Sequence, residues 1–297
     1  MIINTANIAA LFLSYKSLFQ DAFKDAESSW EKIATLVPSS TESNLYAFLG
    51  QFPRLRKWLG ARIIKDMAVH NYTVVNEPFE STVGVPKPKI EDDTFGVFSP
   101  LMSEMGYAAK THPDEIVFEL LKLGASELCY DGQFFFDTDH PVLTLGVAST
   151  VANYDATGAG DLWIAMDTKR PLKPMIFQKR QEYNFVRFNS TNDEHVFMQN
   201  EYLFGVDTRV NAGFGLWQLA YGSLNTLDAT NWDAIVTAMM QLKSDEDRPL
   251  SIRPNLIVVG PGNRAAARAL FETSTLANGA ANPNFKEVEV LVTPYLD

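Results

Sequence analysis

The chain has 297 residues, of which 46% are hydrophobic, so it can bury a sizeable core as one large domain or two of ordinary size. Its formal net charge of −11 argues against a protein whose whole surface grips nucleic acid, because phosphate binding needs a basic face. The single cysteine, Cys129, excludes an internal disulfide and a thiolate zinc cluster, and it fits a reducing compartment.

Apolar residues near the N-terminus recur at helical spacing and predict an amphipathic helix of about four or five turns. Because so apolar a helix must be covered, it lies either on its own domain or on a neighbouring subunit. The continuous apolar run Ile8–Leu13 is too short to cross a bilayer and follows no basic residue, so we expect neither a signal peptide nor a membrane partner. The helical face consists of Ile8, Leu11, Phe12, Tyr15, Leu18, Phe19, Ala22 and Phe23, with Trp30 and Ile33 extending it.

Between the two helical regions, the composition shifts from polar to basic and then to strand-forming residues. Residues 37–44 are a polar linker with turn residues, and residues 53–65 then concentrate basic side chains. Strands are predicted at Tyr72–Asn76 and Phe79–Val85, where neighbouring prolines restrict them to a sheet edge. About 50 residues between two helical regions exceed a routine connection, so we expect an extended arm that reaches onto a neighbouring copy.

The basic segment 53–65 has two possible binding partners, a nucleic acid or a neighbouring protein. Its cations alternate with apolar residues, so the segment can grip phosphates while the Trp58 ring stacks on a base. It can equally pair with an acidic surface, such as residues 91–93, on a neighbouring copy. We favour the protein partner because the other strongly charged segments of the chain are acidic.

A long, kinked helix is predicted from Thr94 onward. Thr111 can cap a second start, in capping-box arrangement with Asp114 and with Pro113 in the first turn. Gly124 either ends this helix or allows close packing within it, and both alternatives stay open. The first part of the helix has one apolar stripe, formed by Phe95, Phe98, Leu101, Met102 and Met105.

An aromatic and acidic loop follows Cys129. A turn is predicted at Asp131-Gly132, before three consecutive phenylalanines. Asp137, Asp139 and His140 are the best candidate ligands for a divalent metal, and with a metal they would indicate a metal-dependent enzyme. A capped turn explains the same residues more simply, because Asp side chains bond their own following backbone, so no metal site is expected.

The second half of the chain is predicted to form a small antiparallel sheet followed by a compact α/β unit. The strands of the sheet are expected at Leu162–Met166, Met175–Phe177, Asn184–Phe188 and Phe197–Phe204, with the same pattern continuing to Trp217. The α/β unit is expected to contain a helix around Trp232–Met240 capped by Asp228 or Thr230, a strand at Leu256–Val259, a helix at Arg264–Phe271 capped by Asn263, and a strand through Val288, Val290 and Val292.

Sequence motifs of catalysis are missing. The four histidines, at positions 70, 112, 140 and 195, lack the spacing of zinc ligands. The loop at 259–264 lacks the Lys-Ser/Thr of a P-loop, and Pro261 removes an amide that a phosphate would need, so a strand-to-helix turn is the better interpretation. No G-x-S-x-G elbow occurs. We therefore expect neither an enzyme nor a cofactor.

Five motifs occur in order along the chain: SWEKIATLVPSST, QFPRLRKWLGARIIKD, YTVVNEPFESTVGVPKPKIEDD, HPDEIVFELL and YDGQFFFDTDHPV. Together they closely resemble the family of Mu-like phage major head (capsid) subunits, the gpT-like proteins. The resemblance runs from about Ala9 to the end of the sequence and is more diffuse after Leu143. It implies an α+β protein with the Hong Kong 97 (HK97) phage capsid fold, and it implies no catalytic residues.

In that fold the chain would have four parts: an N-terminal arm at 1–38, an extended E-loop at 39–93, a peripheral domain with the spine helix and a β-sheet at 94–225, and an axial domain at 226–297. The resemblance implies a major capsid protein that self-assembles in the host cytoplasm into the icosahedral head shell of the virion. The expected partners are other copies in hexamers and pentamers, together with scaffold and portal proteins, while the presence of a decoration protein is left open. Double-stranded DNA would be enclosed without sequence-specific binding.

We expect the arm and the E-loop to supply the contacts between subunits. Apolar residues of the E-loop would dock on the neighbour, while the surrounding cations satisfy acidic groups. The competing functions are a nucleic-acid-binding protein that uses segment 53–65 and the metal-dependent enzyme described above. The predicted interface residues are Phe12, Phe19, Phe52, Arg54, Leu55, Arg56, Lys57, Trp58, Arg62, Ile63, Glu91, Asp92 and Asp93.

Overall fold

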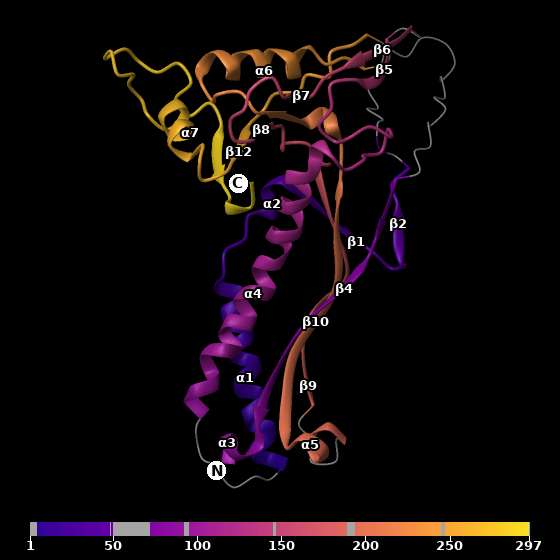
Figure 1. The fold of residues 1–297 in the computed structure, drawn as a ribbon, viewed down its shortest axis with the longest axis vertical. Helices are drawn as coiled ribbons and strands as arrows, with labels where there is room; N and C mark the ends of the chain where they lie inside the picture. The colour runs from indigo at the N-terminus through magenta and orange to yellow at the C-terminus, as the bar shows by residue number, and fades with distance from the viewer. Residues whose placement is uncertain are drawn as a thin grey trace, which may run out of the picture.

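The structure is a computed structural model that describes residues 5–47, 49, 72–91, 95–144, 147–188, 194–244 and 247–296. The described chain is elongated (Figure 1). Two long helices and a long sheet run down the molecule, and a second sheet with its helices forms a broad end. We call these two sheets the long sheet and the end sheet.

The long sheet contains four strands in the order β1-β9-β10-β4. Strands β9 and β10 pair antiparallel, with register shifts around Arg209, and β4 pairs antiparallel with the other side of β10. Strand β4 is therefore an edge strand, as predicted, and an edge is where its residues Pro78 and Pro86 are tolerated. The four strands are β1 (Ala34–Pro38), β4 (Glu77–Pro86), β9 (Met175–Phe188) and β10 (Glu201–Phe214).

Two strand predictions in this sheet were wrong. Residues 175–188 form one strand, although the polar residues after Phe177 predicted a break. Pairing with β10 holds the whole segment extended, so tertiary contacts outweigh the local signal. Phe197 lies in helix α5 (Glu194–Gln199), and the strand that was predicted to include it starts only at Glu201.

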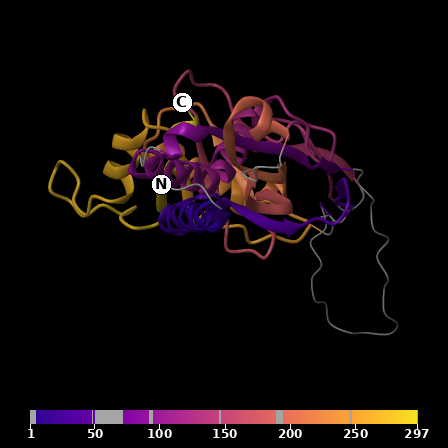
Figure 2. The same cartoon turned by 90° about the horizontal axis from the view of Figure 1, so that it is seen from below.

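Helices α1 (Thr5–Asp25) and α4 (Phe95–Lys122) lie side by side against one face of the long sheet (Figures 1 and 2). Gly106 of α4 permits this approach, because an added Cβ would overlap the carbonyl oxygen of Phe19 in α1. The predicted extension of the first helix to Ile33 was wrong. The helix ends at Asp25, and a separate one-turn helix, α2 (Trp30–Ile33), follows.

Helix α4 is one continuous run of 28 residues that contains Pro100 and Pro113. Thr111 does not cap a second start, since its hydroxyl donates to the carbonyl of Tyr107, one turn earlier, at 3.1 Å. Gly124 lies in the 3-10 turn η1 (Leu123–Ala125) after the helix, without a positive φ. An added Cβ there would lie 2.6 Å from a ring carbon of Phe136, so close packing explains this glycine.

The end sheet contains five strands in the order β13-β12-β8-β11-β7. Its central strand β8 is buried throughout and pairs with β11 on one side and β12 on the other. The domain boundary predicted at residue 225 therefore runs between strands of a single sheet. The strands are β7 (Tyr154–Asp155), β8 (Trp163–Met166), β11 (Ala220–Ser223), β12 (Leu256–Val259) and β13 (Glu289–Val292).

Helices α6 (Ala229–Gln241) and α7 (Arg264–Phe271) complete the broad end. The Asp228 carboxylate caps α6 by accepting the backbone N–H of Asn231 at 2.9 Å, which confirms one of the two predicted caps. Asn263 precedes α7 but makes no capping bond, since its amide donates to the carbonyl of Asp161 at 2.8 Å. The Asp161 carboxylate also lies against Gly262, and a carboxylate in this turn would repel a phosphate.

The remaining elements are short. Two pairs of strands form small antiparallel sheets of their own, β2 with β3 and β5 with β6. Across the described ranges, no helix combines the length and the apolar character that crossing a membrane requires. The bounds are β2 (Ser43–Leu45), β3 (Thr73–Val75), α3 (Lys87–Glu91), β5 (His140–Thr144), β6 (Val147–Val151), η2 (Trp217–Leu219) and η3 (Pro294–Leu296).

Candidate subunit contacts and a buried polar cluster

The loop after η1 is a compact turn that directs polar side chains inward. Gly132 has a φ of +88°, and the Asp131 carboxylate accepts the backbone N–H of Gln133 at 3.1 Å. These features confirm the predicted Asp131-Gly132 turn. The N–H of Cys129 donates to the carbonyl of Gln133 at 2.8 Å, which closes the loop. Asp131 is thereby held facing the start of β5.

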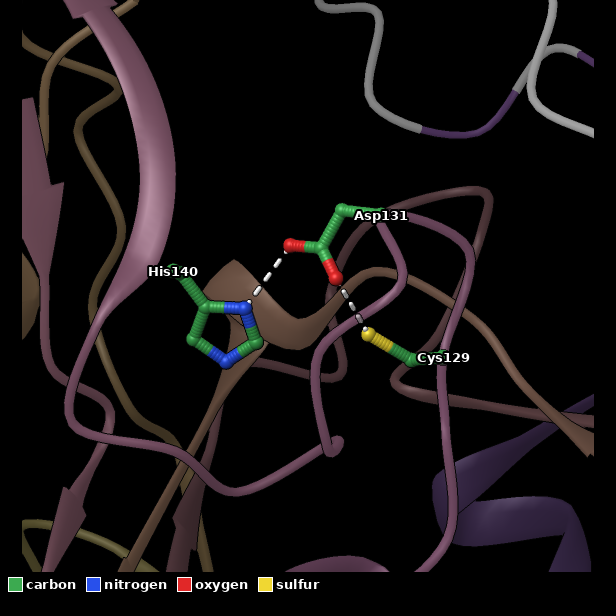
Figure 3. A group of neighbouring side chains, drawn as sticks. All are labelled: Cys129, Asp131 and His140. Atoms are coloured by element: carbon green, nitrogen blue, oxygen red, sulfur yellow. Dashed lines mark hydrogen bonds and ion pairs between the residues drawn. The ribbon is translucent and has the colours of Figure 1, made fainter. Parts of the chain in front are cut away.

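Three side chains of this loop and of β5 meet in the interior (Figure 3). The Asp131 carboxylate lies between the other two: one oxygen is 2.8 Å from Nδ1 of His140, and the other accepts the thiol proton of Cys129 at 3.0 Å. The His140 side chain is fully buried. Its ring stacks on the indole of Trp217, with the ring centroids 3.9 Å apart.

The hydrogen bonds around His140 determine its protonation. Nε2 of His140 lies 3.1 Å from Oδ1 of Asn153, and this oxygen also accepts the backbone N–H of Asp137. The amide orientation of Asn153 is fixed, because its nitrogen faces backbone carbonyl oxygens, the nearest being that of Phe135 at 2.8 Å. Both ring nitrogens of His140 therefore face acceptors, Asp131 and Asn153, and both must carry hydrogen. The ring is an imidazolium paired with the Asp131 carboxylate.

The electrostatics of the cluster agree with this assignment. Burial alone would raise the pKa of Asp131, but the hydrogen bonds from His140 and Cys129 outweigh it and hold the pKa below the ordinary value. The pKa of Cys129 is raised well above its ordinary value by burial and by the adjacent Asp131 charge. The thiol is thus protonated and unreactive as a nucleophile at neutral pH.

The same geometry bears on metal binding. The ligand atoms of Cys129, Asp131 and His140 lie within 4.8 Å of one another, as in a metal centre. In the observed arrangement, however, neither ring nitrogen of His140 has a free lone pair and the thiol keeps its proton, so the cluster is satisfied without an ion. In the described part of the chain, the side chains close enough together to share an ion are those of Cys129, Asp131 and His140, so Asp137 and Asp139 are not members of this group.

Asp137 instead caps its own turn. Its carboxylate accepts the backbone N–H of Thr138 at 2.7 Å and that of Phe134 at 3.3 Å, as expected for the simpler interpretation of these residues. Sequence reasoning missed the roles of Asp131 and Asn153. No short motif signals them, because the contacts of His140 bridge nine residues in one direction and 13 in the other.

Two of the predicted interface residues lie in the described chain with their side chains. Phe19 is only 4% exposed, and its ring lies 5.2 Å from that of Phe185 in the long sheet. Phe12 is partly buried, stacks on Phe185 at 5.6 Å and lies under the Arg187 guanidinium at 4.0 Å. These contacts are within the chain, so an interface role for either residue stays a prediction.

The other predicted interface residues lie outside what the structure describes. Glu91 ends helix α3, and its side chain is not among the described ones. The remaining positions outside the described ranges are Phe52, Arg54, Leu55, Arg56, Lys57, Trp58, Arg62, Ile63, Asp92 and Asp93.

Comparisons with known proteins agree over the whole length of the chain. Residues 8–296 match the profile of a family described as Mu-like prophage major head subunit gpT. The major capsid protein of Escherichia phage Mu is 39% identical, and the alignment covers 100% of both chains. A chain from the procapsid of bacteriophage JBD30 superposes with a TM-score of 0.89 at 50% identity, covering 99% of this chain and 100% of that one. For the JBD30 capsid decorated with minor capsid protein trimers, the TM-score is 0.77 at 40% identity, with 100% of both chains covered.

Proposed function

The chain belongs to the family of Mu-like prophage major head subunits, and from this premise we propose that its arm and extended loop build the contacts between copies in the head shell. It is a structural capsid protein with an HK97-like α+β fold, and it is not an enzyme. The observation that carries this function is the match to a phage major capsid protein over the full length of both chains. None of these relatives supports the alternative of a nucleic-acid-binding protein.

The copies of the subunit form hexamers and pentamers, and these close into an icosahedral shell in the host cytoplasm. A closed shell of identical subunits needs heterologous surfaces, which the arm at 1–38 and the extended loop at 39–93 supply. The peripheral part at 94–225 and the axial part at 226–297 carry these segments. Assembly in the cytoplasm fits the single cysteine, because disulfide bonds are rare in that reducing compartment and one cysteine cannot form one within the chain.

Scaffold and portal proteins guide assembly of the shell, and a decoration protein covers its outside. The decoration protein is suggested by the JBD30 capsid, which carries trimers of a minor capsid protein. The shell encloses double-stranded DNA without sequence-specific binding. A net charge of −11 supports this, since an acidic wall does not adhere to phosphates.

In the extended loop, Phe52, Leu55, Trp58 and Ile63 dock on a neighbouring copy, and the adjacent basic residues pair with acidic groups such as those at 91–93. The four apolar residues and the cations alternate in sequence, which supports a contact that is both apolar and charged. Phe12 and Phe19 contribute by fixing α1 on the long sheet. The opposite face of α1, where Leu13 is 64% exposed, is then presented to a neighbour.

Deletion of residues 50–71 tests the role of the extended loop. Leu49 is fully buried and should be kept, and the backbone N–H of Tyr46 donates to the carbonyl of Tyr72 at 2.8 Å, so a short Gly-Ser linker can join the cut ends. We expect a folded subunit, judged by circular dichroism, that forms no shells in negative-stain micrographs when its scaffold is present. Efficient shell formation by the deletion variant would refute the proposal.

A charge reversal gives a finer test. Arg54→Glu with Arg56→Glu should reduce shell formation, whereas Arg264→Glu with Arg268→Glu, on exposed positions of α7, provides a matched control. If the reversal instead leaves assembly intact and abolishes the retention of oligonucleotides by the wild-type protein, the segment is a nucleic-acid-binding element.

A further inference from the structure

Two projections of the broad end contain no charged side chain. No Asp, Glu, Lys or Arg occurs at 141–154 or at 273–285, although 21% of the whole chain is charged. The first stretch contains most of the β5-β6 hairpin, and the second is a loop after α7, which we call the uncharged loop. Both carry exposed apolar residues, such as Val147 at 67% and Leu276 at 41%.

In the part of the chain that the structure describes, the β5-β6 hairpin is a two-stranded sheet that is anchored to the core at its base. Its strands pair from His140 and Val151 to Thr144 and Val147. At this base, the ring of His140, which begins β5, is hydrogen-bonded to Asn153, which follows β6, so the two strands are held together. Val142 and Val151 pack against the main core. Residues 147–150 are exposed beyond this base. An open edge with exposed β-branched residues and no charge is a site of strand or surface association unless something covers it.

The uncharged loop also has a preformed shape. Its tip is closed by hydrogen bonds from Leu276 N–H to the carbonyl of Ala280 at 2.8 Å and from Gly279 N–H to the carbonyl of Leu276 at 2.9 Å. The buried amide of Asn282 donates to the carbonyls of Leu270 and Thr273 and ties the loop to the end of α7. A surface that is already ordered loses little entropy when it binds a partner.

The two projections lie on opposite flanks of the same end of the molecule (Figure 1). The uncharged loop, in yellow, extends away from the body in both views (Figures 1 and 2). They therefore cannot meet within one subunit, but two copies placed head to tail bring the hairpin of one against the loop of the next. Repeated contacts of this heterologous kind close into a ring when the rotation between copies permits it.

We propose that strand β6 of one subunit, with its exposed residues 147–150, docks on the uncharged loop of the next copy around each ring of the head shell. This inference rests on the proposed function, because it assigns the partner as another copy of the same chain. Two surfaces that both lack charge can be buried together without leaving an unpaired ion, which makes them suited to each other. The exposed hairpin is then covered in the shell.

Charges introduced into the two projections test the contact. Val147→Glu or Leu276→Lys alone should lower the yield of assembled particles by roughly tenfold or more, because each places an unpaired charge in an apolar contact. The combination of Val147→Glu with Leu276→Lys should recover much of the yield, since every contact then pairs opposite charges. Val147→Glu with Leu276→Glu should not recover it. Met240→Glu, at an exposed position of α6, is the matched control.

Circular dichroism of the unassembled variants separates lost assembly from lost folding. If wild-type protein forms no particles with its scaffold, the proposed function fails. If wild type assembles and both singly charged variants assemble equally well, only the docking inference fails. Failure of the oppositely charged pair to recover assembly would also overturn it, and would indicate that another protein covers one of the flanks.

A cysteine pair gives direct evidence of contact. The natural thiol of Cys129 is buried, so Val147→Cys with Leu276→Cys adds the only accessible thiols in the described part of the chain. Mild oxidation of assembled particles should produce a ladder of covalent oligomers on a non-reducing gel. Particles that yield only monomers would contradict the proposed contact, and each single cysteine variant serves as the control.

Discussion

The carboxylate of Asp114, in the middle of α4, accepts the backbone N–H of Trp30 in α2 at 2.6 Å. The same oxygen accepts the N–H of Ser29 at 2.8 Å. The one-turn helix α2 has no side-chain cap of its own, so a residue 84 positions away satisfies its first donors. Burial raises the pKa of Asp114, and the two backbone hydrogen bonds oppose this increase. Because α2 leads directly into β1, this contact joins the first strand of the long sheet to helix α4.

Replacement of Asp114 should therefore destabilise the subunit. Asp114→Ala leaves two N–H groups without an acceptor, and we expect the free energy of unfolding to fall by about 2 kcal/mol. Urea unfolding of the unassembled subunit measures the change. Asp114→Asn keeps an acceptor oxygen and should lose less. Thr111→Ala, whose hydroxyl bonds only its own helix, is the control, and equal midpoints for the two alanine variants would contradict this role.

The buried pair of Asp131 and His140 should make stability depend on pH in the acid range. The pKa of Asp131 lies below its ordinary value of 3.8, so its stabilising contribution is complete above pH 3.8 and is lost as the pH falls through the folded-state pKa. We expect Asp131→Asn to cost about 3 kcal/mol near pH 6, because it leaves the imidazolium without its counter-charge. The difference from wild type should shrink below pH 3.8.

Urea unfolding between neutral and acid pH measures this dependence. Glu127→Gln, at an exposed position in the same loop, controls for the general effect of removing a carboxylate. A difference between wild type and Asp131→Asn that stays constant across the whole pH range would show that the pair does not carry the effect. The ¹⁵N shifts of the His140 ring provide an independent check, since both nitrogens should show the shifts of protonated imidazole.

Cys129 should be unreactive in the folded protein. The thiol is buried, and its pKa is raised by burial and by the Asp131 carboxylate, so both access and the thiolate form are suppressed. We expect its labelling by a disulfide reagent at neutral pH to be at least about 100-fold slower in the folded than in the unfolded chain. Ser126→Cys, an exposed position in the same loop, should label rapidly. Equal rates for Cys129 and the added cysteine in folded protein would contradict the buried cluster.

Local signals in the sequence predicted those elements whose structure depends on local contacts. The strand at Leu256–Val259 and the helix at Arg264–Phe271 have the predicted bounds, and Asp228 caps α6. The polar stretch after Phe177 predicted a break in the strand, but pairing with β10 keeps it extended. The residue pattern within β9 carries no information about that partner strand. The capping box at Thr111 and Asp114 failed for the same reason, since Asp114 serves a different helix.

The buried cluster was only partly predictable. The turn at Asp131-Gly132 and the capping role of Asp137 follow from local chemistry, and both were anticipated. The state of His140 depends on Asn153 and on stacking with Trp217, which are 13 and 77 positions away. No pattern along the chain reports such contacts. The proposed docking of hairpin and loop likewise rests on which flanks the fold places opposite each other, and this is not readable from local sequence patterns.

The order of strands in the end sheet also determines when a newly made subunit can finish folding. Strand β8, at 163–166, is sandwiched between β11 at 220–223 and β12 at 256–259, and β12 in turn needs β13 at 289–292 as its other neighbour. A nascent chain on the ribosome therefore keeps this core open until β12 and β13 have emerged. A chain that lacks β13 leaves one side of β12 unpaired, so we expect the end sheet to complete its folding only after residues 289–292 have left the ribosome.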